Sequence, residues 1–204
     1  MRQLPLALAL ATLLAAPLAA QATVYQFTAT LSPANEVGPP PASTATGLAL
    51  LAYDDKGTAS LADDSYDFTL AVFGLASAPT GYHIHGAATA AENAPVRIAI
   101  DSDPAFSKNF SGATLMVSGN DVTPPALIPA TPSSPTNAGH PAMSFLDMLQ
   151  GGLAYVNVHT AAAPAGATRG QLTAVQAVPV PEPSSYAMLL AGLGLVGLLA
   201  RRRR

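Results

Sequence analysis

The sequence predicts an all-β domain, an antiparallel Greek-key-like β-sandwich or flattened barrel with one short helix, flanked by an N-terminal signal and a C-terminal apolar helix. First, short β-type stretches such as VYQFTATL (24–31) and YDFTLAVF (66–73) recur along the chain, with turn residues between them. Second, an apolar pattern with helical spacing occurs once between the two ends, at residues 142–150. Third, the roughly 150 residues between the ends are enough for the core of one domain.

The strands are expected, in chain order, at residues 24–31, 46–53, 66–73, 81–85, 96–100, 113–119, 153–160 and 169–177. In the single helix, Pro141 can occupy the first turn and Gly151-Gly152 ends it. The segment 123–141 contains six prolines and is too long for an ordinary connection. It is therefore predicted to be a mobile or functional loop.

The N-terminus has the features of a secretory signal peptide at residues 1–22. A basic start at Arg2 is followed by a Leu/Ala-rich stretch (4–20) and by the small-x-small site Ala20-Gln21-Ala22. Cleavage is therefore expected after Ala22, and the β domain is expected to occupy residues 23–176.

The C-terminus has three parts in order. A proline-rich linker (177–185) contains Val180-Pro181-Glu182-Pro183, and the segment 186–204 combines an apolar helix with the cluster Arg201, Arg202, Arg203 and Arg204. The apolar helix reaches only about 22 Å, against roughly 30 Å of hydrocarbon core, which favours transient membrane contact with the arginines on the cytoplasmic side.

This arrangement resembles the PEP-CTERM sorting signal of Gram-negative bacteria. The resemblance implies that an exosortase recognises the tail after export across the inner membrane. It also implies that the tail is removed and that the protein is released or attached at the cell surface.

Charge and cysteine content exclude two classes of function. Five of the nine basic residues lie in the two terminal segments, at Arg2 and in the C-terminal cluster. Four basic and twelve acidic residues remain, so the exported region has a net charge near −8 and is not expected to bind nucleic acid. The absence of cysteine excludes disulfides and thiolate metal sites.

Three blocks of the central region resemble a known family. They are FTATLSPANEVGPPPASTATGLALLAYD (27–54), GYHIHGAA (81–88) and LQGGLAYVNVHTAAAPAGATRGQL (149–172), and they resemble the start, middle and end of a CHRD domain. The resemblance implies a secreted binding or structural module with no established enzymatic activity. One position departs from the family pattern, because Ala167 stands where an acidic residue is usual.

Two of the four histidines lie on one predicted strand, and a third lies on a later strand. His83 and His85 point to one face of their strand, since side chains alternate along a strand. In AYVNVHT, Val156 and Val158 are expected to face the core, which places His159 on the outer face with Tyr155 and Asn157. If the two strands are neighbours, three imidazoles meet on the outer surface of the sheet. Imidazoles suit copper or zinc, and three of them leave one coordination position open.

A more distant likeness concerns the copper site of copper–zinc superoxide dismutase, which is also laid out on a β-sandwich. It implies His83, His85 and His159 as ligands, with Arg169 as an anion-guiding group. The fourth ligand would have to be His140, on the proline-rich segment, or be missing. The sequence has no His-rich zinc segment and no disulfide, and the acidic domain does not favour an anionic substrate, so dismutase-like chemistry is a minor alternative.

The histidines also have a purely structural interpretation. His83 and His85 could form hydrogen bonds with loop carbonyls, Asn157 or the Thr160 hydroxyl, and Arg169 could pair with an aspartate. This network is preferred, because a fourth ligand is not evident. The leading hypothesis is thus a non-enzymatic exported protein that binds at the cell surface or in its polysaccharide matrix, and the alternative is a copper- or zinc-binding domain.

Overall fold

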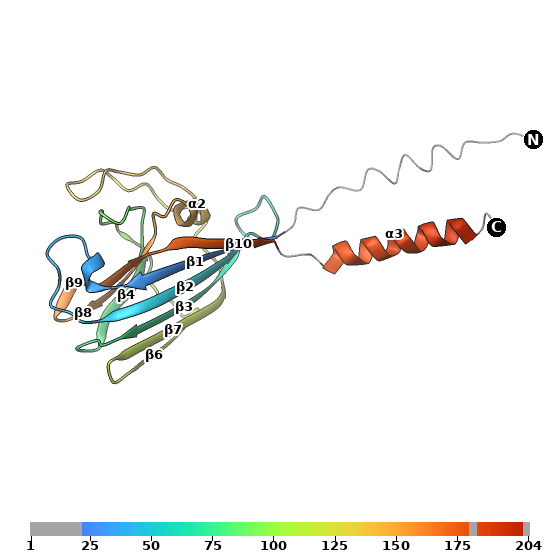
Figure 1. Ribbon diagram of the computed structural model, residues 1–204. Helices are drawn as coiled ribbons and strands as arrows, with labels where there is room; N and C mark the ends of the chain where they lie inside the picture. Colours follow the sequence, from blue (N-terminus) through green and yellow to red (C-terminus); the bar gives the residue numbers. More distant parts are fainter. Residues whose placement is uncertain (1–21, 180–182, 202–204) are drawn as a thin grey trace, which may run out of the picture.

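Two antiparallel sheets lie face to face in the computed structural model, which describes residues 22–179 and 183–201 (Figure 1). The larger sheet has the strand order β10-β1-β2-β3-β7-β6, and the smaller has the order β5-β4-β8-β9. The strands are β1 (Thr23–Leu31), β2 (Thr46–Asp54), β3 (Ser65–Phe73), β4 (Pro79–His85), β5 (Val96–Ile98), β6 (Phe106–Ser111), β7 (Thr114–Val122), β8 (Tyr155–Thr160), β9 (Ala163–Gln171) and β10 (Thr173–Pro179). Both sheets are open, so the predicted all-β fold takes the form of a sandwich and not a closed barrel.

Alternating apolar residues build the core between the sheets. Phe27, Ala29 and Leu31 of β1 are buried on one side, and Val156 and Val158 of β8 are buried on the other. Burial of a large apolar side chain such as Phe27, Leu31 or Val156 stabilises the fold by roughly 1.5–3 kcal/mol relative to an exposed one. The same alternation turns the intervening residues of β4 and β8 outward.

Two strands differ from the sequence-based expectation. Strand β6 was not predicted, because polar residues fill four of the six positions in FSKNFS, as suits an edge strand. The expected single strand 169–177 divides at Leu172, whose backbone N–H donates to the Ala154 carbonyl at 2.9 Å. The chain thereby passes from β9 in the smaller sheet to β10 in the larger one.

The predicted helix is present but shorter than expected. Helix α2 (Phe145–Gln150) begins after Ser144, whose hydroxyl accepts the backbone N–H of Asp147 at 3.0 Å, and it ends at Gly151. Pro141 therefore lies outside the helix. A 3-10 turn, η1 (Pro33–Asn35), was not predicted.

The proline-rich segment is a paired arm and not an irregular loop. Antiparallel bridges join Ile128 to Met143, Thr131 to His140, and Ser134 to Asn137. We refer to residues 128–143 as the arm.

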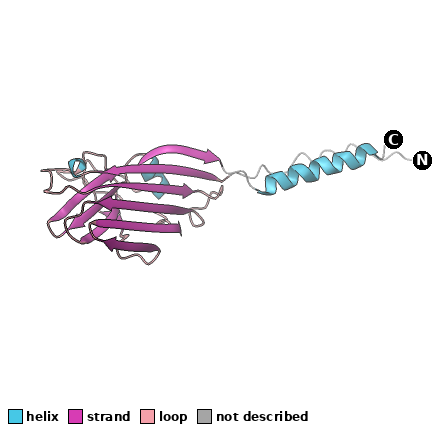
Figure 2. Cartoon of the chain, turned by 60° about the horizontal axis from the view of Figure 1, so that its bottom comes forward, coloured by secondary structure: helices cyan, strands magenta, loops and turns pink. Residues whose placement is uncertain are grey.

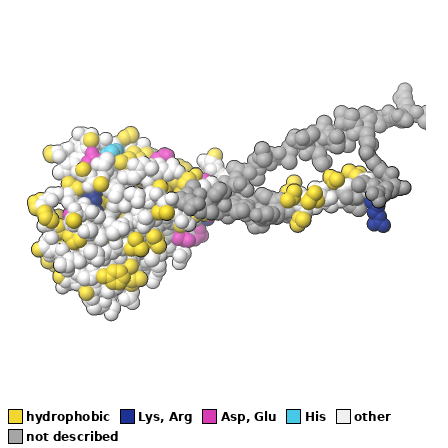
Figure 3. Space-filling model, viewed as in Figure 1, with side chains coloured by type: hydrophobic (Ala, Val, Ile, Leu, Met, Phe, Trp, Pro, Cys, Tyr) yellow, Lys and Arg dark blue, Asp and Glu magenta, His cyan; other side chains and the backbone are white. Residues whose placement is uncertain are grey.

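The structure covers the terminal predictions only in part. The β10 strand extends into the expected linker as far as Pro179, and helix α3 (Pro183–Arg201) begins three residues earlier than expected and lies apart from the sheets (Figure 2). Ala22, Pro183 and Arg201 are described, whereas Ala20, Val180, Pro181, Glu182, Arg202, Arg203 and Arg204 lie outside the described residues. Among the helices of the described ranges, none has both the length and the apolar character to cross a membrane. Few basic side chains occur on the face of the domain in Figure 3, in keeping with its acidic composition.

Candidate metal centre

Three histidines meet on the outward face of the smaller sheet. Strand β4 supplies His83 and His85, and the neighbouring strand β8 supplies His159, which lies opposite Gly81 in the register. One ring nitrogen from each imidazole lies within 4.8 Å of the others. The ring centroids are 5.5 Å apart for His83 and His85, 5.3 Å for His83 and His159, and 5.9 Å for His85 and His159. The sequence-predicted juxtaposition of these three residues is thus present, and we call them the histidine cluster.

Each imidazole of the cluster is held from outside by an acceptor. His83 Nε2 lies 3.0 Å from Asp101 Oδ2, His85 Nδ1 lies 2.9 Å from the Ala94 carbonyl, and His159 Nδ1 lies 3.1 Å from the Pro164 carbonyl. Because a carbonyl or carboxylate oxygen can only accept, each of these nitrogens donates its N–H. In the neutral ring, the second nitrogen is then a lone-pair donor, the form that binds a metal.

The inner nitrogens of two of these rings have no partner. His83 Nδ1 and His85 Nε2 are buried, and no group in the described part of the chain forms a hydrogen bond with either. A hydrogen-bond network therefore explains only the ring nitrogens bonded to Asp101, Ala94 and Pro164, which we call the outer nitrogens. Leaving a buried acceptor unsatisfied costs about 1–3 kcal/mol, so the two atoms need an explanation.

Burial also keeps His85 and His159 of the cluster neutral. Desolvation lowers the pKa of His85 to about 4, and the positive charge of nearby Arg169 acts in the same direction. Desolvation likewise lowers the pKa of His159. Both rings are therefore uncharged at neutral pH and available as ligands.

Gly81 provides the space that His83 occupies. A Cβ atom at this position would lie 2.8 Å from His83 Cε1 and 3.3 Å from Asp101 Oδ2. Only a residue without a side chain lets His83 lie between Gly81 and Asp101. This explains why a glycine precedes Tyr82 and His83 in GYHIH.

The cluster lies on the outward face of the smaller sheet, as predicted, and loops border it there. Asn157 and Tyr155 are buried, and the cluster borders a cavity of about 370 Å³. Residues of the loop 36–42 and of the segment 162–166 also line this cavity. The loop cover was not predicted, because the strand pattern specifies which way a residue points and does not specify which loops fold over it.

Tyr155 and Arg169 form a stack behind His85. The rings of His85 and Tyr155 are stacked with centroids 4.9 Å apart and an interplanar angle of 11°. The Arg169 guanidinium carbon lies 3.5 Å from the Tyr155 ring centroid, which is cation–π geometry.

Arg169 does not have either of the roles expected for it. It is 1% exposed, and its guanidinium donates to Asn93 Oδ1 and the Thr89 carbonyl, both at 3.1 Å, and not to an aspartate. A buried guanidinium whose N–H groups are engaged within the protein cannot guide anions from solvent.

Glu36 is a site residue that the sequence analysis missed. It follows η1, and its Oε2 accepts Asn157 Nδ2 at 3.2 Å. Its Oε1 and Asn157 Oδ1 are buried, with no partner among the residues that the structure describes. Burial raises the pKa of Glu36 to about 7. The available signal for Glu36 was its position in PANEVG, within the first block that resembles a CHRD domain. The alternation of strand residues gave no indication of it.

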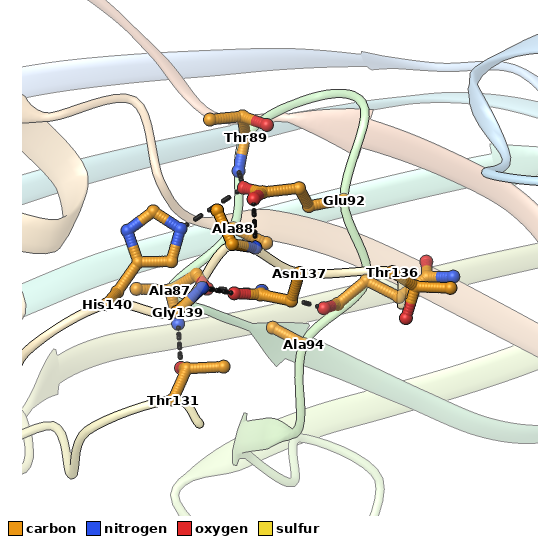
Figure 4. Close-up of polar contacts among 12 residues, drawn as sticks. Ala87, Ala88, Thr89, Glu92, Ala94, Thr131, Thr136, Asn137, Gly139 and His140 are labelled. Atoms are coloured by element: carbon orange, nitrogen blue, oxygen red, sulfur yellow. Dashed lines mark hydrogen bonds and ion pairs between the residues drawn. The ribbon is translucent and has the colours of Figure 1, made fainter. Parts of the chain in front are cut away.

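His140 is not part of the cluster. His140 lies on the arm, and its Nε2 is 3.1 Å from Glu92 Oε2, so this candidate for a fourth ligand is engaged elsewhere. The same carboxylate accepts the backbone N–H groups of Thr89 at 2.8 Å and Ala138 at 2.7 Å (Figure 4). These contacts lower the pKa of Glu92 to about 2, with the two backbone donors as the main causes.

The arm thereby fixes the loop that holds His85. Asn137 Nδ2 donates to the carbonyls of Ala87 at 3.0 Å and Asn93 at 2.9 Å (Figure 4). The next residue after Asn93 is Ala94, whose carbonyl accepts from His85. The proline-rich segment thus has a supporting role and not a ligating one.

Fold and site together define an open β-sandwich with an imidazole-rich, loop-covered centre on one outward face. The CHRD domain family matches residues 27–172, more than half of the chain, and the chain belongs to this family. The PEP-CTERM protein-sorting motif matches residues 179–204, which implies export and processing by an exosortase. Comparisons with curated proteins and with solved structures return no match.

Proposed function

We propose that this exported CHRD domain binds one copper or zinc ion through His83 Nδ1, His85 Nε2 and His159 Nε2. The observation that carries the proposal is the pair of buried, unpartnered ring nitrogens within the cluster. A metal ion would bind both of them, whereas a hydrogen-bond network within the protein satisfies only the outer nitrogens.

The surroundings of the cluster support the same function. Ligating histidines in proteins almost always donate their other N–H to a carboxylate or carbonyl, and all three do so here. Three neutral imidazoles without a thiolate or thioether suit copper(II) and zinc, with copper(II) expected to bind more tightly.

We propose a binding role and not dismutase chemistry. Arg169, the one candidate for an anion-guiding group, is buried and hydrogen-bonded inside the domain. The exported region is acidic, which disfavours an anionic substrate.

Metal analysis of the full chain tests the proposal. After purification in mild detergent and dialysis against copper(II) or zinc, the wild type should retain about one equivalent. His83→Gln and His159→Gln should each lower the affinity by more than the ~10–100-fold typical of changes around the ligands. His140→Gln is the matched control, because it removes a histidine outside the cluster, and it should bind as the wild type does. Equal metal content in all four proteins, or none in the wild type, would overturn the proposal.

We further propose that the metal-binding domain functions at the cell surface or in the surrounding polysaccharide matrix, after transient membrane contact through the tail. The sorting motif and the apolar helix α3 support this location. Mass spectrometry of the cellular protein should show a form that is shorter than the precursor at both ends. A full-length inner-membrane form that keeps its four C-terminal arginines would contradict the proposed processing.

A further inference from the structure

We infer that the fourth ligand of the metal is an exchangeable water held by Glu36 and Asn157, and that these two residues make the site disfavour small anions. The inference rests on the proposed metal site and deepens it, because it names the class of ligand that the open position takes.

Unsatisfied acceptors are concentrated at this site. Buried side-chain atoms without a hydrogen-bond partner number five in the described residues, and four of them belong to this site. These four are His83 Nδ1, His85 Nε2, Asn157 Oδ1 and Glu36 Oε1; the fifth is Thr168 Oγ1 of β9. Such atoms are rare in proteins, so their concentration at one place points to a ligand.

The four unsatisfied atoms are two nitrogens and two oxygens, and they differ in the partner that each needs. The ring nitrogens present lone pairs, which a metal ion takes. The oxygens of Glu36 and Asn157 also present lone pairs, and they need hydrogen donors. Asn157 Oδ1 is an acceptor because the amide nitrogen already donates to Glu36 Oε2. A metal-bound water has two O–H groups, one for each oxygen, whereas an anion such as azide would place negative charge against both.

Three of the four residues with unsatisfied atoms, together with His159, border the same space. Glu36, His85, Asn157 and His159 line one cavity of about 370 Å³. One water occupies about 30 Å³ in the liquid, so the cavity can hold the metal-bound water and further waters through which it exchanges.

Glu36 is also fixed in position. The turn before it is held by Asn35, whose side-chain amide donates to the carbonyls of Thr30 at 3.1 Å and Arg169 at 3.0 Å. Gly166, with φ of +145°, faces the Glu36 carboxylate so closely that a Cβ there would overlap with Oε1. A carboxylate held on a fixed turn can orient a ligand, because little freedom is lost when the ligand binds.

The test uses the full chain loaded with one equivalent of copper(II). Longitudinal relaxation of the solvent protons reports an exchangeable water on the metal, since only such a water transmits the paramagnetic effect efficiently to bulk. We expect excess relaxation in the wild type, and we expect saturating azide to remove it. Copper bound in one equivalent without excess relaxation would overturn this inference and leave the proposed metal site intact. Failure to bind copper at all would overturn both.

Azide titration at about pH 8, above the pKa of about 7 that burial gives Glu36, then tests the role of this carboxylate. Glu36→Gln removes the negative charge, keeps the side-chain size and supplies an N–H donor, so azide should bind about tenfold more tightly. Asp121→Asn is the matched control, because it removes a carboxylate that is 82% exposed on the larger sheet, and the affinity for azide should remain that of the wild type. An azide affinity that is equal in Glu36→Gln, Asp121→Asn and the wild type would overturn the role of Glu36.

Discussion

The outward faces of the two sheets arise from the same alternation of side chains along the strands, but they differ in their exposure to solvent. On the larger sheet, Leu48, Leu50, Phe73 and Met116 point outward and are 45%, 50%, 52% and 44% exposed. On the smaller sheet, outward residues such as Tyr155 and Asn157 are 2% and 4% exposed, because loops cover them. The two faces thus differ in their cover: polar residues of the smaller sheet are buried because loops fold over them, and the same loops enclose the cavity beside the histidine cluster.

The largest loss of stability is expected from a change at Tyr155, on the covered face. Tyr155→Ala should destabilise the domain by about 3–5 kcal/mol, because it leaves a buried space between His85 and Arg169. It should also weaken metal binding, since the Tyr155 hydroxyl accepts the Ala94 backbone N–H at 3.1 Å and so holds the residue that orients His85. Urea unfolding with and without metal measures both effects. Wild-type stability in this variant would contradict the account of the covered face.

The next effect concerns Gly81. Gly81→Ala should move His83 away from Asp101 and lower metal affinity by roughly 10–100-fold, the range for lost support around a ligand. Competition with a chelator measures the change, and Asp101→Asn should give an effect in the same direction. Unchanged affinity in Gly81→Ala would show that His83 does not need its present position.

The contacts of Glu92 with the arm should make the stability of the domain fall at acid pH. Glu92 has a pKa near 2 in the folded protein, below its ordinary value of 4.5, so its stabilising contribution is complete above pH 4.5 and is lost as the pH falls toward 2. The melting temperature of the wild type should therefore fall more steeply over this window than that of Glu92→Gln. Parallel curves for the two proteins would contradict a role for this carboxylate in holding the loop.

The smallest effect is expected on the exposed face. Leu50→Thr should change the free energy of unfolding by less than about 0.5 kcal/mol and leave metal binding unchanged, because half of this side chain is already in solvent. A large loss of stability would mean that the outward face of the larger sheet is covered in solution by another surface.

Much of the fold could be predicted from the sequence, because alternation is a local property. It placed most strands and brought His83, His85 and His159 to one face. It could not place Glu36, which reaches Asn157 across 121 positions of sequence through the packing of a loop. For the same reason it misassigned His140 and Arg169, whose partners are set by loops and not by strand period.

The polar edge strand β6 was missed for a related reason. Pairing with β7 holds β6 in the sheet, although its polar composition does not indicate a strand. The break at Leu172 depends on which sheet each half of residues 169–177 can join. Residues whose structure is fixed by distant partners are thus those that a single sequence describes least well.

X-ray absorption spectroscopy of the copper-loaded full chain is the most direct test of the account. The account predicts three imidazole nitrogens and one oxygen at about 2.0–2.1 Å from the metal. A spectrum with fewer than three imidazoles, or one in which His140→Gln loses an imidazole and His159→Gln does not, would contradict it.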